Sequence, residues 1–166
     1  MKKLSVILAL AMLLVWAKDV RGQSDDASSR ETLKGLNPIG VLVQLQESCA
    51  RRGYVAAVLQ NEVELQLRMA GIKVLPIGTT AQATLRVLLL CFEVNGSIQG
   101  YFFTQRSEVV QWVEWPFSRP TKLASVATWS SLISLGTESD NNATRVRDII
   151  SRSIKQFINA WLAVNQ

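Results

Sequence analysis

The stretch NEVELQLRMAGIKVLP, residues Asn61 to Pro76, predicts a helix that ends at a glycine and continues as an extended segment. Apolar residues spaced four, four and three positions apart form one stripe on this helix: Leu59, Val63, Leu67 and Ala70. Gly71 then lies where a helix end favours the left-handed conformation, and Pro76 prevents the helix from resuming. A phosphate-binding glycine turn would precede a helix, so we interpret Gly71 as structural.

A strand is predicted on each side of this helix. Residues 39–47 alternate between apolar and polar, which indicates a strand with one buried face. Residues 83–94 are apolar on both faces through their middle, which is typical of a central strand. Asn95-Gly96 favours a hairpin turn, and the strand that follows extends to Trp115. Its length predicts a bulge near Ser107 and Glu108.

A further strand is predicted over residues 123–135, with Trp129 at its centre as a structural residue. The stretch SDNNAT, residues 139–144, offers N-caps before a long amphipathic helix, which completes the predicted order. We therefore predict an α/β (α+β) fold, a two-layer sandwich in the order β-α-β-β-β-α. The sheet should be mostly antiparallel, with two helices on one face. A right-handed crossover should leave the first two strands parallel.

The first 22 residues resemble a secretory signal peptide, with two lysines, an apolar run from Leu4 to Trp16 and small residues before a cleavage site. We expect cleavage after Gly22, with Ala17 as the alternative. The apolar run is short for a permanent membrane anchor, and no cysteine follows it where a lipid anchor would attach. The protein is therefore expected to be exported, and periplasmic or secreted.

Residues 23–37 are polar and lack periodicity, so we predict a flexible lead-in before a single domain over residues 38–166. The leader holds four of the 18 basic and one of the 13 acidic residues, so its removal lowers the net charge from +5 to +2. This small charge gives no support for a nucleic-acid partner.

Cys49 and Cys91 are the two cysteines of the chain. Cys49 follows the first predicted strand and Cys91 lies late in the second, so a parallel crossover would bring both to one end of the sheet. An exported setting permits a disulfide. Two buried, reduced thiols are the alternative, and the sequence leaves both open.

Aromatic side chains on the third predicted strand are the candidate binding surface: Tyr101, Phe103, Trp112 and Trp115. Together with Trp129 they could form a platform for a sugar, peptide or lipid on the open face of the sheet, or they could fill the core.

Catalytic chemistry finds little support in the sequence. The chain has no histidine, which excludes a Ser-His or Cys-His relay and removes the commonest zinc ligand. Neither a nucleophile elbow nor a phosphate-binding loop is present. The strand-associated acids Glu47, Glu93, Glu108 and Glu114 are interpreted as solvated. We expect no enzyme activity, no cofactor and no metal site.

Three segments resemble a family of small exported bacterial proteins of uncharacterised function: EVELQLRMAGIKVL, VATWSS and QFINAWLAVN. The element order also resembles envelope accessory domains, such as the lipoprotein of the lipopolysaccharide translocon and the N-terminal domain of the Tol propeller protein. The resemblance implies an envelope accessory or interaction protein without catalytic activity. A small-ligand or lipid-binding protein, with an apolar groove between sheet and helices, is the alternative.

Overall fold

The computed structural model describes residues 25–76, 79, 81–94, 100–115, 122–137 and 143–166. Some side chains beside the gaps, including those of Tyr101 and Trp115, lie outside this description. The predicted signal peptide, residues 1–22, and the hairpin turn at Asn95-Gly96 also fall outside the described residues.

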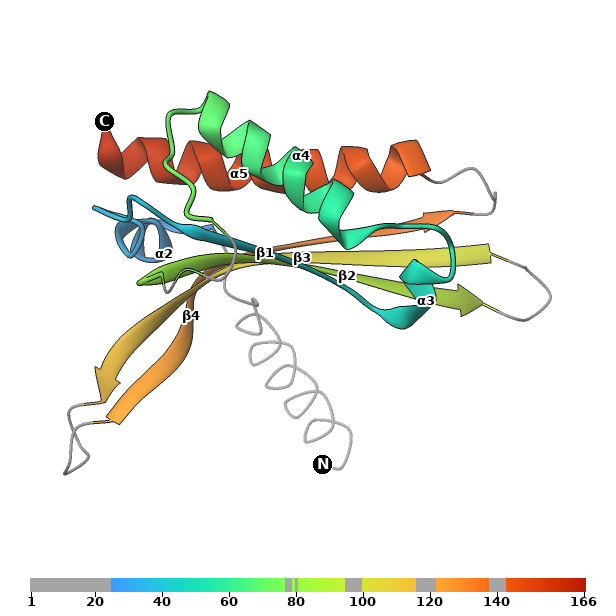
Figure 1. The fold of residues 1–166 in the computed structure, drawn as a ribbon, viewed down its shortest axis with the longest axis horizontal. Helices are drawn as coiled ribbons and strands as arrows, with labels where there is room; N and C mark the ends of the chain where they lie inside the picture. Colours follow the sequence, from blue (N-terminus) through green and yellow to red (C-terminus); the bar gives the residue numbers. More distant parts are fainter. Residues whose placement is uncertain (1–24, 77–78, 80, 95–99, 116–121, 138–142) are drawn as a thin grey trace, which may run out of the picture.

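Four strands form one sheet in the order β1-β2-β3-β4, and the two long helices α4 and α5 lie together on one of its faces (Figure 1). In chain order the elements are α2 (Ala27–Glu31), β1 (Gly40–Leu45), α3 (Glu47–Ala50), α4 (Ala56–Met69), β2 (Ala83–Val94), β3 (Gly100–Trp115), β4 (Lys122–Thr137) and α5 (Ala143–Asn165). Strand β1 pairs with β2 in parallel, whereas β2–β3 and β3–β4 are antiparallel. The predicted α+β fold is confirmed, with the short helices α2 and α3 in addition.

Helix α4 ends in a hydrogen-bonded cap around Gly71, whose φ is +82°. The Ile72 N–H donates to the Leu67 carbonyl, and the Gly71 N–H donates to the Arg68 carbonyl, both at 3.0 Å. This pair of bonds is the Schellman pattern, in which the apolar residues at both ends of the cap also come together. Leu67 and Ile72 are both buried, and the cap directs the chain from α4 back to the edge of the sheet, where Val74 forms a bridge with Ile39.

The core lies between the sheet and the two long helices. Strand β2 contributes one face of alternating residues, and α5 contributes a stripe at helical spacing. Trp129 is fully buried and packs edge-on against Phe157 of α5, with ring centroids 5.4 Å apart. Because these large side chains meet between the layers, the space between sheet and helices is filled.

The segment before β1 is folded, so the prediction of a flexible lead-in is wrong for its described residues. Helix α2 begins with a capping box at Asp26, and Leu33 is fully buried. The Asn165 side chain at the end of α5 donates to the Leu33 carbonyl and accepts from the Gly35 N–H. The Trp161 indole N–H donates to the Leu36 carbonyl at 2.8 Å. These contacts come from 125 or more residues away and leave no local signal.

The bulge in the β3–β4 hairpin lies between Val109 and Val110, two residues beyond the predicted position. Ser107 and Glu108 keep regular pairing, with Ser131 and Ser130 as their partners. The extra residue is Thr128 on β4, because Val109 pairs with Trp129 and Val110 pairs with Ala127. Beyond the bulge the hairpin bends away from the helices (Figure 1).

The outer edge of β1 is occupied by groups from outside the sheet. The buried Gln60 side chain of α4 accepts from the Val43 N–H and donates to the Val41 carbonyl, at 3.4 and 3.3 Å. Two residues before Val41 on the same edge, the Ile39 N–H donates to the Lys73 carbonyl and the Leu75 N–H donates to the Ile39 carbonyl. The glutamine amide thus makes the same donor–acceptor pair that a neighbouring strand would make.

Candidate functional site

The predicted aromatic surface is divided between the two faces of the sheet. Phe103 is 1% exposed, faces the helices and packs edge-on against Tyr54 with ring centroids 6.1 Å apart. Trp112 is 54% exposed. Residues 103 and 112 are nine positions apart, and an odd separation on one strand places side chains on opposite faces. The prediction of one surface is therefore wrong for this pair, while the side chains of Tyr101 and Trp115 lie outside the described part.

The face of the sheet opposite α4 and α5 carries apolar side chains on all four strands, and we call it the open face. Register and alternation place these apolar residues on it: Leu42, Leu88, Leu90, Phe92, Phe102, Val110, Trp112 and Leu132. Leu132 is 65% exposed, and the rings of Phe92 and Phe102 lie 6.5 Å apart on neighbouring strands. Exposed apolar patches spread over several elements are typical of interaction surfaces.

A charged cluster lies in the middle of the open face. The Arg86 guanidinium donates to Oε1 of Glu108 from Nε, at 2.5 Å, and from Nη2. On the other side of the carboxylate, Nη2 of Arg106 lies 2.8 Å from Oε2. The Glu108 side chain is 4% exposed, whereas the two arginine side chains are 43% and 49% exposed. The prediction of a solvated acid is therefore wrong for Glu108.

The cluster has an excess positive charge, because two guanidinium groups share one carboxylate. Each guanidinium also has more N–H donors than its bonds to Glu108 use. In the register, Arg86 is flanked by Leu42 on β1, and Arg106 is flanked by Leu88 and Leu132. The open face therefore combines apolar contact area with outward-facing donors that match a carboxylate or phosphate.

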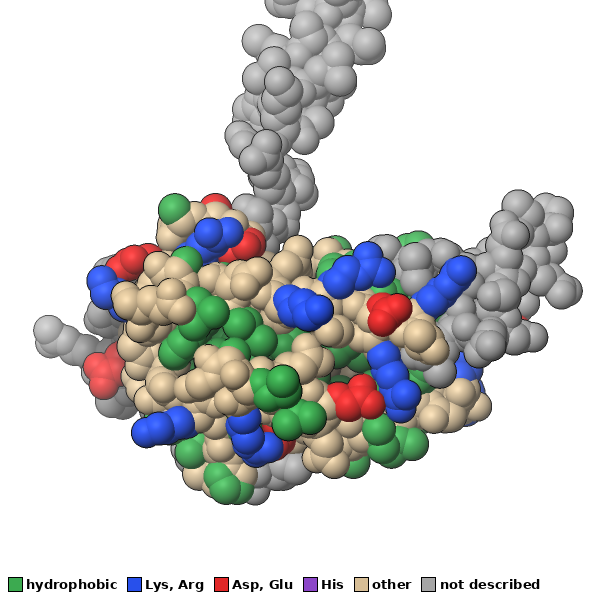
Figure 2. Space-filling view, turned by 90° about the horizontal axis from the view of Figure 1, so that it is seen from above, with side chains coloured by type: hydrophobic (Ala, Val, Ile, Leu, Met, Phe, Trp, Pro, Cys, Tyr) green, Lys and Arg blue, Asp and Glu red, His purple; other side chains and the backbone are tan. Residues whose placement is uncertain are grey.

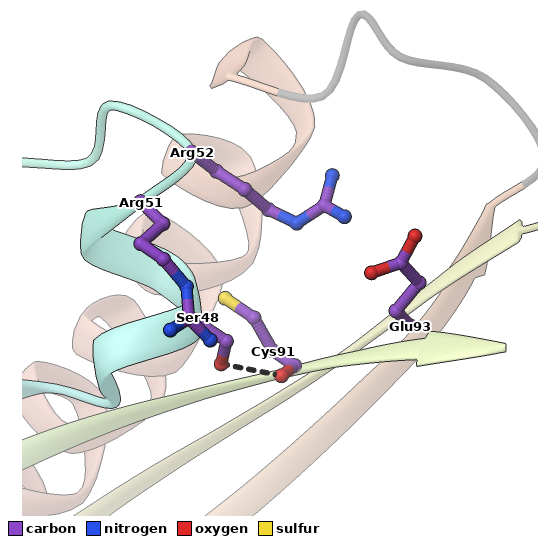
Figure 3. Close-up of a pocket in the computed structure, with 5 residues that line it drawn as sticks. All are labelled: Ser48, Arg51, Arg52, Cys91 and Glu93. Atoms are coloured by element: carbon purple, nitrogen blue, oxygen red, sulfur yellow. Dashed lines mark hydrogen bonds between the residues drawn. The ribbon is translucent and has the colours of Figure 1, made fainter.

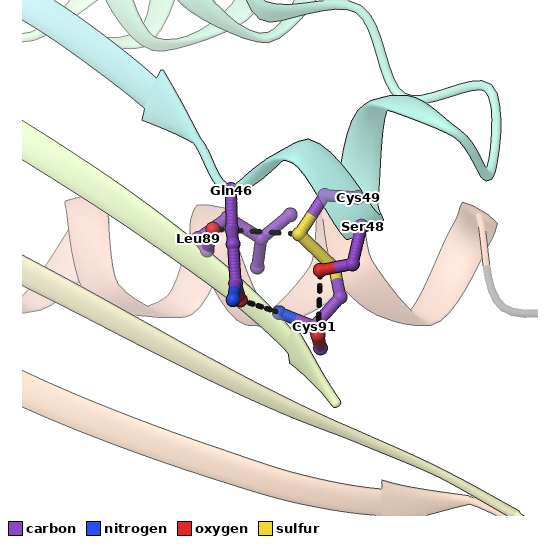
Figure 4. Close-up of a disulfide and its surroundings, with 5 residues drawn as sticks. All are labelled: Gln46, Ser48, Cys49, Leu89 and Cys91. Carbon is purple, nitrogen blue, oxygen red and sulfur yellow. Dashed lines mark hydrogen bonds between the residues drawn. A yellow bond between two sulfur atoms is a disulfide. The ribbon is translucent and has the colours of Figure 1, made fainter. Parts of the chain in front are cut away.

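Cys49 and Cys91 are joined by a disulfide that ties α3 to β2, with Cα atoms 5.3 Å apart. Both residues are buried. Two hydrogen bonds from α3 and from the residue that precedes it surround the disulfide (Figure 4). The Ser48 hydroxyl donates to the Cys91 carbonyl at 2.7 Å, and the side chain of Gln46, the N-cap residue of α3, accepts from the Cys91 N–H at 3.1 Å. This arrangement holds α3 against the strand and gives the disulfide a structural place in the fold.

A shallow hollow of about 280 Å³ adjoins the disulfide (Figure 3). Ser48, Arg51, Arg52, Cys91 and Glu93 line it, and the Arg52 and Glu93 side chains point toward each other across it. Arg51 is paired with Glu47 at 3.0 Å, and both side chains are more than two-thirds exposed. The opposed charges and the exposure make this a solvated surface region, with little to select an anionic ligand.

A second hollow, of about 130 Å³, lies near the start of α4. Gly53, Tyr54, Val55, Val58, Leu59 and Arg147 line it. Burial raises the pKa of the Tyr54 phenol above its ordinary value. The lining residues belong to α4, the segment before it and α5, so this hollow does not lie where the apolar groove between sheet and helices was predicted. Its volume is also below the 300 Å³ or so at which ligand pockets usually begin.

The helix-covered face carries mixed charge. Figure 2 shows Lys, Arg, Asp and Glu side chains scattered around hydrophobic side chains on this face. Arg147 of α5 forms an ion pair with Glu62 of α4 at 3.2 Å, so part of the basic charge of α5 is compensated. Within the described residues, no three His, Cys, Asp or Glu side chains gather as a metal site. None of the described helices is both long enough and apolar enough to cross a membrane.

Near the start of the described chain, Asp25 joins the first residues to the core. The hydrogen bond from Arg30 holds the pKa of the Asp25 carboxyl below its ordinary value of 3.8, and burial opposes that effect. The Trp129 indole N–H also donates to Asp25, at 3.2 Å. Asp25 therefore links the chain before α2 to the central tryptophan of β4.

No protein-family model matches the chain, and no curated protein matches it. Among solved structures, the chain is similar to a PelC dodecamer from Paraburkholderia phytofirmans, with a TM-score of 0.43 and 13% identity over 83% of this chain and 92% of that chain. It is also similar to a minor lipoprotein from Acinetobacter baumannii, with a TM-score of 0.40 and 11% identity over 78% of this chain and 93% of that chain. Likenesses of this strength identify no family.

Proposed function

We infer that the chain is an exported accessory protein of the bacterial envelope, which acts by binding another protein and not by catalysis. The single observation that carries this function is the open face, where apolar residues such as Leu132 and Trp112 are more than half exposed around a charged cluster. The signal-peptide pattern of the first 22 residues supports export.

The filled core favours a protein partner over a small ligand. A binder of small apolar molecules would need a deep cleft, and Trp129, Phe157 and Phe103 occupy the space between the layers. A patch of apolar side chains on a sheet face offers a broad contact area instead, as protein interfaces do. The buried disulfide supports a role outside the reducing cytosol.

Site-specific photo-crosslinking in living cells tests this function. A photoreactive phenylalanine at position 132, on the open face, is expected to give a discrete adduct with another protein. The same group at Met69, which is 79% exposed on α4, is the matched control and should give none. Equal adducts at both positions, or none at position 132, would show that the open face is not the interaction surface.

A further inference from the structure

We propose that the partner covers the open face with an apolar segment that carries one carboxylate, and that this carboxylate binds the Arg86–Glu108–Arg106 cluster. The proposal rests on the proposed function and adds the chemistry of the partner. Three properties of the open face support it: the excess charge of the cluster, its position within the apolar surface, and the distance between the apolar ends.

The excess charge requires an anion from whatever covers the face. In solvent, two half-exposed guanidinium groups around one carboxylate are stable, because water hydrates the remaining positive charge. A purely apolar cover would remove that water and leave the charge uncompensated, which costs more than the apolar contact returns. A carboxylate from the partner would pair with the donors that Glu108 does not use, and planar guanidinium groups match a carboxylate with two parallel bonds.

A second copy of the chain does not meet this requirement. Face-to-face packing of two open faces about a twofold axis would bring two clusters of excess positive charge into one apolar interface. Like charges placed together in an interface disfavour that partner. The charge therefore selects against self-association through this face and in favour of an acidic partner.

The position of the cluster favours a protein segment over a membrane surface. Phe102 lies four residues before Arg106 on β3, and Trp112 lies six residues after it. The basic groups are thus central, with apolar side chains toward both ends of the strand. A surface that inserts into a bilayer has the opposite order, with apolar side chains at the tip and basic groups around them at headgroup level.

The spacing also gives the length of the segment. At about 3.3 Å per residue, Phe102 lies roughly 13 Å from Arg106, and Trp112 lies roughly 20 Å on the other side before the bend at the bulge is considered. A helix rises 1.5 Å per residue, so about 20 helical residues would contact both ends. We expect an apolar stripe at helical spacing, interrupted by one Asp or Glu away from its ends.

The experiment combines the crosslinker at position 132 with charge changes in the full chain. Arg106→Glu should reduce the adduct about tenfold or more, because it reverses one charge of the cluster at a buried contact. Arg106→Gln, which adds no repulsion, should reduce it less. Arg106→Lys keeps the charge but loses the planar pair of donors, so its adduct should lie between those of the wild type and Arg106→Gln. Arg152→Glu, on the exposed side of α5, is the matched control and should leave the adduct unchanged. Thermal unfolding of each variant shows whether it is folded. If Arg106→Glu is not folded, the adduct of Arg106→Gln tests the proposal instead.

Sequencing of the crosslinked peptide completes the test. The expected result is a peptide with an apolar stripe and an Asp or Glu, and replacement of that acid by Arg should restore the adduct with Arg106→Glu. An adduct between two copies of the chain, a peptide without an acid, or an adduct insensitive to Arg106→Gln would overturn the proposed chemistry while leaving an interaction surface in place. Binding of the purified protein to phosphatidylglycerol vesicles, lost in Arg106→Glu, would assign the cluster to lipid instead. Absence of any adduct at position 132 would overturn both this inference and the proposed function.

Discussion

Removing the bond between Cys49 and Cys91 should lower the free energy of unfolding by about 4 kcal/mol. The two residues are 42 positions apart, and the chain-entropy relation for a loop of that size gives this value at 25 °C. Alanine is the suitable replacement at both positions, because the residues are buried and a serine would bring an additional hydroxyl into the core. A loss of this size is a large part of the total stability of an ordinary domain.

Urea unfolding of the mature protein, with and without a thiol reductant, measures the effect. With a slope near 2 kcal/mol per M, the midpoint of the wild-type protein should fall by about 2 M on reduction, and that of the double alanine variant should not move. The reduced wild type and the variant should unfold at similar midpoints. Two reactive thiols per chain in denatured, unreduced protein would refute the reasoning outright, and so would a wild-type midpoint that ignores the reductant.

Three further predictions come from the fold, and a fourth comes from the sequence. Gly71→Ala should destabilise the protein by about 1 kcal/mol, because φ is +82°; the new Cβ meets no atom within 4 Å, so the cost is that of the backbone conformation alone. Gly71→Asn should cost less. Equal melting temperatures of the wild type and Gly71→Ala would contradict this account. Asp25→Asn should be most destabilising at neutral pH. The pKa of Asp25 is lowered in the folded state, so its carboxylate contributes stability at pH values above 3.8, and this stability is lost as the pH falls through the folded-state pKa. The free energies of unfolding of wild type and variant should therefore differ less at about pH 3 than at about pH 7. Gln60→Ala should cost about 1–3 kcal/mol, because the backbone groups of β1 lose a buried partner, and hydrogen exchange at Val43 should accelerate. The intact mass of the exported protein should correspond to cleavage after Gly22, and a retained leader would contradict the predicted export.

Local sequence signals were sufficient for the four strands, the two long helices and their order, but not for the short helices α2 and α3. The stripe and glycine around Gly71, the alternation before Leu45 and the apolar run of β2 each depend on neighbours within a few residues. The bulge was displaced from its predicted position because it depends on Thr128, a residue of the opposite strand. Leu33 in the lead-in is buried, and its carbonyl accepts a hydrogen bond from Asn165 at the far end of the chain. No pattern among neighbouring residues predicts such a contact.

The candidate surface was only partly accessible from sequence. Alternation alone separates Phe103 from Trp112, since nine positions on a strand reverse the face, and that signal was present from the start. The burial of Glu108 was not accessible, because it requires the register that places Arg86 opposite it on β2. Charged side chains on different strands become a site only through the pairing of those strands.

The Gln60 side chain at the edge of β1 has a consequence for assembly. Growth of a sheet by repeated strand addition needs two edges that accept a neighbour, one for each direction of growth. Here the amide already occupies the backbone groups of Val41 and Val43, so an incoming strand would first have to displace a buried side chain. Fibre-like polymerisation through the sheet is therefore blocked on one side, and any association by strand pairing at β4 should stop at two chains.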